Sequence, residues 1–99
     1  MSTYWITFRI HDSGNSQERR DDLYAAINDI STMWWVEPTS FIVFESSESA
    51  DTIAAKAKAA IRPSVDIVLL GMTEFKTARL IGAAVDHDID QLIPFLKRV

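Results

Sequence analysis

The chain has 99 residues, of which 47% are hydrophobic and 24% are charged, a size and composition typical of one small globular domain. It contains no cysteine, which excludes a disulfide framework, thiolate metal sites and a cysteine nucleophile. The net charge of −4 opposes nonspecific attraction to nucleic acid, and no apolar run approaches the roughly 20 residues that span a bilayer. We therefore expect a cytoplasmic protein without a membrane partner, for which nucleic acid is a disfavoured partner.

The first predicted element is a strand at residues 3 to 10, because its side chains alternate between two faces. One face carries Tyr4, Ile6, Phe8 and Ile10, and the other carries Trp5, Thr7 and Arg9. A loop follows, and from about Glu18 the apolar residues take helical spacing, at Leu23, Ala26, Ile27 and Ile30. Arg19 and Arg20 precede two aspartates in this helix, and we interpret the arginine pair as local charge balance.

The middle of the chain predicts a hairpin, a helix and a buried strand. Residues 32–37 and 40–45 are rich in aromatic and β-branched residues and are separated by Pro38 and Thr39, a pattern that predicts a hairpin. An alanine-rich helical pattern follows and ends at Arg62-Pro63. Residues 64–71 are too continuously apolar for a half-exposed strand, which predicts a strand near the centre of the sheet.

This order, β-α-β-β-α-β, predicts an α+β fold of the ferredoxin-like type, with an antiparallel sheet and two helices on one face, in a single domain at residues 1–99. Residues 76–85 fit either a short fifth strand or an irregular return. A C-terminal tail helix is predicted after Asp86 from the spacing of Ile89, Leu92, Ile93 and Leu96. Pro94 is compatible with that helix only if it begins near Asp90.

The strands carry apolar residues at successive positions, as in Tyr4-Trp5-Ile6 and Trp34-Trp35-Val36, so both faces of the sheet are expected to be covered. A second apolar face of several hundred Å² is more than a soluble monomer normally exposes. Because most soluble oligomers are homo-oligomers, we expect a homodimer, with Trp5, Arg9, Trp34 and Trp35 at the dimer interface or binding surface.

Three alternatives to that dimer stay open. In the first, a different protein covers the second face. In the second, the chain from Lys76 onward covers that face itself. In the third, the tryptophans stack on nucleic-acid bases. The pattern also leaves open which of Trp34 and Trp35 faces the helices, because a register slip of one residue exchanges the faces.

Several segments together resemble a known family. They are an opening Tyr-x-Ile-x-Phe-x-Ile strand, a helix with Tyr24 and Ile27, the Trp34-Trp35 pair, the stretch from Thr39 to Phe44, and an apolar strand led by Asp66. Over residues 4 to 72 this pattern is similar to small ferredoxin-like proteins related to the second CRISPR-associated protein, including short bacterial relatives and the virulence-associated protein D toxins. The shared motifs are mainly hydrophobic pattern, and the last third of the chain is unmatched.

The resemblance implies an aspartate at the end of the first strand, near a dimer axis, where two chains present carboxylates to a divalent metal for phosphodiester cleavage. The matching residue here is Arg9, and an arginine cannot bind Mg²⁺ or act as a base near neutral pH. We therefore expect a homodimeric interaction or structural module with no catalytic residue, metal or cofactor. The alternatives are a metal-dependent RNA or DNA endonuclease that uses Asp12 with Mg²⁺ or Mn²⁺, and a nucleic-acid binder without catalysis.

The run from Asp86 to Asp90 has the Asp-x-Asp-x-Asp beginning of a calcium loop. Gln91 and Lys97 stand where such a loop needs glycine and glutamate, so calcium coordination would be incomplete. The pattern favours capping of the last helix by Asp88 or Asp90.

The residues His11, Asp12 and Ser13 are of the types found in a catalytic triad. Adjacent residues of a strand point to opposite faces, so this spacing does not place the three side chains together. A histidine in the loop after the first strand is the favoured interpretation.

Overall fold

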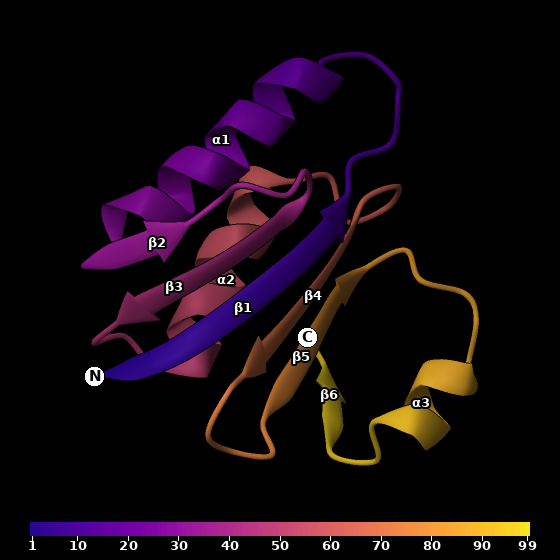
Figure 1. Ribbon diagram of the computed structural model, residues 1–99. Coiled ribbons are helices and arrows are strands. Elements are labelled where there is room, and N and C mark those ends of the chain that lie inside the picture. The colour runs from indigo at the N-terminus through magenta and orange to yellow at the C-terminus, as the bar shows by residue number, and fades with distance from the viewer.

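The computed structural model describes all 99 residues and places helices on both sides of one mixed sheet (Figure 1). The strands are β1 (Ser2–Arg9), β2 (Met33–Trp35), β3 (Phe41–Ser46), β4 (Ile67–Met72), β5 (Ala78–Gly82) and β6 (Leu96–Arg98). The helices are α1 (Ser16–Asp29), α2 (Ala50–Ala60) and α3 (Asp88–Leu92). The strand order is β2-β3-β1-β4-β5-β6, in which only the β5–β6 pair is parallel. The predicted α+β class and the mainly antiparallel sheet are confirmed.

The central strand β1 has the predicted alternation. Tyr4, Ile6 and Phe8 are buried, whereas Thr7 and Arg9 on the other face are exposed. Residues paired across antiparallel strands share a face, so the pairs of Ile6 with Ile42 in β3 and with Leu70 in β4 extend the buried face in both directions. The core therefore lies on the face of β1 that carries its even-numbered residues.

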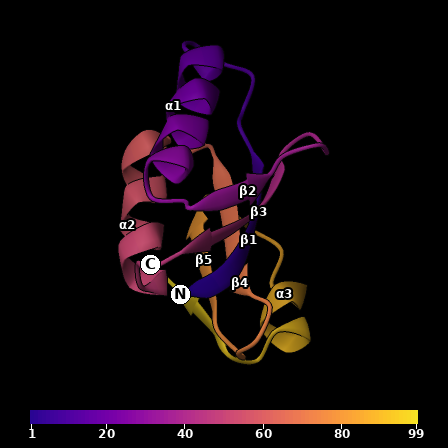
Figure 2. The same ribbon diagram turned by 60° about the vertical axis from the view of Figure 1, so that its left-hand side comes forward.

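Helices α1 and α2 lie together on that face (Figure 2). Leu23 and Ile27 of α1 and Ile53 and Ala57 of α2 are buried, as the helical spacing predicts. The Oγ atom of Ser49 accepts a hydrogen bond of 3.1 Å from the backbone N–H of Thr52 and so caps the N-terminus of α2. The two helices and the sheet enclose a continuous apolar core.

The predicted hairpin is confirmed and its register is fixed. Trp34 is paired with Phe44, packs on the core and contacts the Tyr24 ring edge-on, with the centroids 6.3 Å apart. Trp35 is paired with Val43 and is 47% exposed. Trp34 is therefore the tryptophan that faces the helices.

The C-terminal region differs from the prediction in part. Residues 78–82 form a regular strand, β5, which settles the alternative left open for residues 76–85. The expected tail helix is wrong beyond Leu92, because α3 ends there and Leu96 instead begins β6, paired in parallel with Ala78. Ile93 has φ −126° and ψ 82°, outside the helical region, as expected for a residue that precedes proline.

Candidate functional site

The sheet face that points away from α1 and α2 is apolar across most of its width. Trp5 is paired with Val43 on one side and Gly71 on the other, and Leu69 is paired with Leu80, so these residues share this second face. Its large apolar side chains are Met33, Trp35, Phe41, Val43, Trp5, Ile67, Leu69 and Leu80. The prediction of two apolar faces is correct.

The C-terminal segment, residues 83–99, passes over one half of this face, at β4 and β5, through α3, and its strand β6 then joins the edge of the sheet. Figure 2 shows α3 on the side of the sheet opposite α1 and α2. The backbone N–H of Ala83 donates to the Asp66 carbonyl over 2.9 Å, and that of Val99 donates to the Leu80 carbonyl over 3.1 Å. Leu80 is only 5% exposed. The alternative in which the chain covers its own second face is therefore correct for this half.

The other half of the face, over β1, β3 and β2, has no cover within the chain. We call it the open half; its apolar residues are Trp5, Met33, Trp35, Phe41 and Val43, and Thr3, Thr7 and Glu45 share the face with them. Met33 is 73% exposed, and the Trp5 and Phe41 rings stack with their centroids 6.4 Å apart. A Cβ atom on Gly71 would collide with the Trp5 indole, so the ring lies directly over the glycine. Trp5 therefore packs against Phe41 and Gly71, whereas the Trp35 side chain is exposed to solvent.

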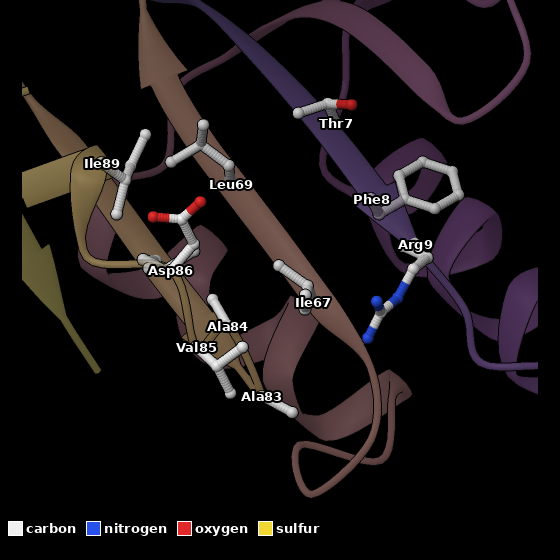
Figure 3. A pocket seen from close by; sticks show the side chains of 11 residues that line it. Thr7, Phe8, Arg9, Ile67, Leu69, Ala83, Ala84, Val85, Asp86 and Ile89 are labelled. Atoms are coloured by element: carbon white, nitrogen blue, oxygen red, sulfur yellow. The ribbon is translucent and has the colours of Figure 1, made fainter. Parts of the chain in front are cut away.

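A pocket of about 640 Å³ lies between the covered half and the C-terminal segment (Figure 3). Its lining comprises Thr7, Phe8, Arg9, Ile67, Leu69, Leu80, Ala83, Ala84, Val85, Asp86 and Ile89. Arg9 and Asp86 are its only charged residues, and Figure 3 shows them on opposite sides of the apolar wall. Pockets that bind small molecules have this size and this mixture of apolar lining with a few polar groups.

Arg9, which sequence analysis assigned to an interface or binding surface, lies at the edge of this pocket. Its Nη2 atom donates a hydrogen bond of 3.2 Å to the Val65 carbonyl, and no carboxylate lies within ion-pair distance of its guanidinium. Because a guanidinium has five N–H donors, most of its donors have no protein partner.

A buried ion pair lies at the same end of the sheet as Arg9, beneath the helices, and sequence analysis missed it. Arg19 is not part of a local charge balance, because its Nε atom donates to Asp66 Oδ2 over 2.9 Å and both side chains are buried. Arg19 also binds the carbonyls of His11 and Ser13. Arg19, Leu23 and Ile27 are four residues apart, so extending the apolar stripe of α1 one turn toward its N-terminus would have placed Arg19 on the buried face.

Asp66 collects hydrogen bonds from three segments. Besides Arg19, the backbone N–H groups of His11 and Arg62 donate to it over 2.8 Å each. Burial by itself raises the pKa of Asp66, but the hydrogen bonds from Arg19, Arg62 and His11 outweigh it and hold the pKa below its ordinary value. With every buried side-chain polar atom satisfied, this cluster acts as a structural clamp between the loops.

The candidate nuclease residue Asp12 is exposed in the loop between β1 and α1. No group of three or more histidine, aspartate or glutamate side chains is arranged to hold a metal ion. His11 Nδ1 lies 3.0 Å from Ser13 Oγ, but no carboxylate contacts the imidazole, so a triad is not assembled.

The acidic run before and within α3 is engaged in local contacts. Asp90 lies 3.1 Å from His87 Nδ1 and from Arg98 Nη2, and the hydrogen bond with His87, followed by that with Arg98, lowers the pKa of Asp90. The backbone N–H of Asp88 donates to the Asp86 carboxylate over 2.9 Å. The prediction that Asp88 or Asp90 caps the helix is wrong, because Asp86, two residues earlier, is the side chain that accepts from its first turn.

No protein-family model, curated protein or solved structure matches the chain. None of its helices combines the length and the apolar character needed to cross a membrane. The surfaces and charges described above are therefore the basis for inferring function.

Proposed function

We propose that the protein is a non-catalytic interaction module that forms a homodimer through the open half of its sheet. The observation that supports this proposal is the exposure of Trp35 and Met33, which share a sheet face with Trp5, Phe41 and Val43. Burying apolar area stabilises an association by roughly 25 cal/mol per Å², and aromatic residues are the side chains that most often anchor interfaces.

A second copy of the chain is the occupant that the shape and charge of this surface favour. Glu45 is the one charged residue among the neighbours of Met33, Trp35 and Val43 on this face, and the chain carries a net charge of −4, which disfavours nucleic acid and anionic membranes. The C-terminal segment stands above one half of the face. Two copies related by a two-fold axis can each cover the open half of the other. This arrangement requires that the C-terminal segment of each copy lies beyond strand β2 of its partner, at the edge of the partner's sheet.

The fold belongs to the same proposal. The order β2-β3-β1-β4, with α1 and α2 on one face, agrees with the ferredoxin-like arrangement, to which β5 and β6 are an extension. This agreement supports a relationship in fold with the family of the second CRISPR-associated protein. Arg9 stands where that family has its metal-binding aspartate, so we do not extend the relationship to nuclease activity.

The dimer is tested by sedimentation equilibrium of the wild-type chain and of Trp35→Ala. Loss of a buried aromatic anchor should weaken association by about 2 kcal/mol or more, which is roughly thirtyfold in Kd. Phe75→Ala is the matched control, because Phe75 is an exposed aromatic residue outside the open half and its removal should leave association unchanged. A wild-type monomer at micromolar concentration, or equal dissociation constants for the wild type and Trp35→Ala, would contradict the proposal.

The absence of catalysis is tested by incubating the protein with single-stranded RNA or double-stranded DNA in the presence of Mg²⁺ or Mn²⁺. We expect no cleavage above that of a buffer control. Metal-dependent cleavage that Asp12→Ala abolishes would replace the interaction module with the endonuclease alternative.

A further inference from the structure

The pocket beneath the C-terminal segment is separate from the open half and has a different chemistry. Ile67 and Leu69 of β4 lie on one side of it, and the segment that includes Ile89 lies on the other (Figure 3). The dimer proposed above uses the other half of the face, so this pocket does not depend on it.

Arg9 gives the pocket a preference for one charge. Its hydrogen bond to Val65 uses one of its five donors and steadies the side chain along the end of β4. The remaining donors have no carboxylate partner in the chain. A planar guanidinium with free donors binds a carboxylate through two parallel hydrogen bonds.

Asp86 restricts the ligand further. Its carboxylate lines the side of the pocket away from Arg9 (Figure 3), where it accepts one hydrogen bond from the Asp88 backbone. A second anionic group on the ligand would be repelled there, because like charges that approach each other near a protein surface destabilise binding.

We propose that this pocket binds a small amphipathic monocarboxylate. The carboxylate of the ligand pairs with Arg9, and its apolar chain lies on Ile67 and Leu69 beneath the C-terminal segment. This assignment follows from the volume of about 640 Å³, the apolar lining and the single unpaired cation.

The test is isothermal titration of the full chain with decanoate, with decanol and decyltrimethylammonium as neutral and cationic probes of equal chain length. Decanoate should bind with one saturable site, more tightly than either of the other probes. Arg9→Gln should weaken decanoate binding by roughly tenfold or more, because a hydrogen-bonded charge pair contributes about that factor. Arg20→Gln, on α1 and outside the pocket, is the matched control and should bind decanoate like the wild type.

Two further variants keep the result specific to this pocket. Ala84→Phe should fill the space and weaken decanoate binding without unfolding the chain, whereas Trp35→Ala should leave it unchanged because Trp35 belongs to the open half. Decanedioate should bind more weakly than decanoate, and Asp86→Asn should reduce that difference. The proposal is overturned if decanoate does not saturate, if decanol binds equally well, or if Arg9→Gln binds decanoate like the wild type.

Discussion

The two faces of the sheet contain similar apolar residues but differ in what covers them. Phe44 and Val43 are neighbours in β3, yet Phe44 is 1% exposed beneath the helices while Val43 is only half-buried on the second face. The helices belong to the same chain and bury most of their face. The difference teaches that apolar alternation predicts that a face needs a cover, while the identity of that cover depends on long-range topology.

The two faces also use arginine differently. Arg19, at the end of the helix-covered face, is buried and has its charge balanced by Asp66. Arg9, on the second face, is exposed and has one backbone partner. A buried guanidinium whose donors are bound to the protein has none left for a ligand, and loss of its partner is destabilising, whereas one with free donors beside an apolar pocket is available to a ligand.

The largest effect expected on the helix-covered side follows removal of the buried carboxylate. Asp66→Ala should lower the free energy of unfolding by roughly 3–5 kcal/mol, because it leaves Arg19 buried without a counter-charge. Urea denaturation measures this loss. Asp51→Ala, which breaks the ion pair with Arg79 at an exposed site, should change stability little. Equal losses of unfolding free energy in the two variants would mean that the pair of Arg19 and Asp66 contributes no more to stability than an exposed ion pair.

Adjacent residues of β3 give a direct comparison of the faces. Phe44→Ala removes a fully buried ring and should cost about 3–5 kcal/mol in folding, whereas Val43→Ala should cost about 1 kcal/mol. The comparison requires denaturation at a protein concentration where both variants are in the same oligomeric state. If Val43→Ala were as destabilising as Phe44→Ala, the second face would be as well covered as the first.

Gly71→Ala sharpens the account of the open half. The added methyl group would meet the Trp5 indole, so the ring must shift, at a cost of about 1–3 kcal/mol. The shift should change tryptophan fluorescence and weaken dimerisation. Unchanged fluorescence together with wild-type stability would show that the indole does not lie over Gly71.

The smallest effect concerns pH. Because the pKa of Asp66 is lowered in the folded state, its contribution is fully present above about pH 4, near the ordinary value, and is lost as the pH falls through the lowered pKa. The pKa values of Asp51 and Asp90 are lowered as well, by Arg79 and by His87 with Arg98. Asp66→Asn should therefore lose stability less steeply with acid than the wild type, and an identical acid dependence would contradict this assignment.

The periodicity of apolar residues along the sequence predicts most of the strands and helices correctly. The alternation in β1, the Leu23 and Ile27 stripe of α1 and the hairpin around Trp34 are all found in the structure. The C-terminal helix was overestimated because Pro94 ends the helical region, and the nearby edge of β5 offers hydrogen-bond partners to Leu96 and the residues after it.

The candidate site was predicted less completely than the fold. Arg9 and the tryptophans were identified from strand periodicity, but the pairing of Arg19 with Asp66 joins residues 47 positions apart and has no local signature. The pocket likewise requires the C-terminal segment to return across β4 and β5. Contacts between segments that are distant in the sequence depend on the tertiary topology. The periodicity of a single strand or helix does not specify that topology.

The most direct test of the dimer is an isotope-filtered NOE measurement on a mixture of labelled and unlabelled chains. We predict NOEs between copies that involve Trp35 and Val43. The absence of any NOE between copies, or contacts between copies confined to α1 and α2, would contradict the dimer.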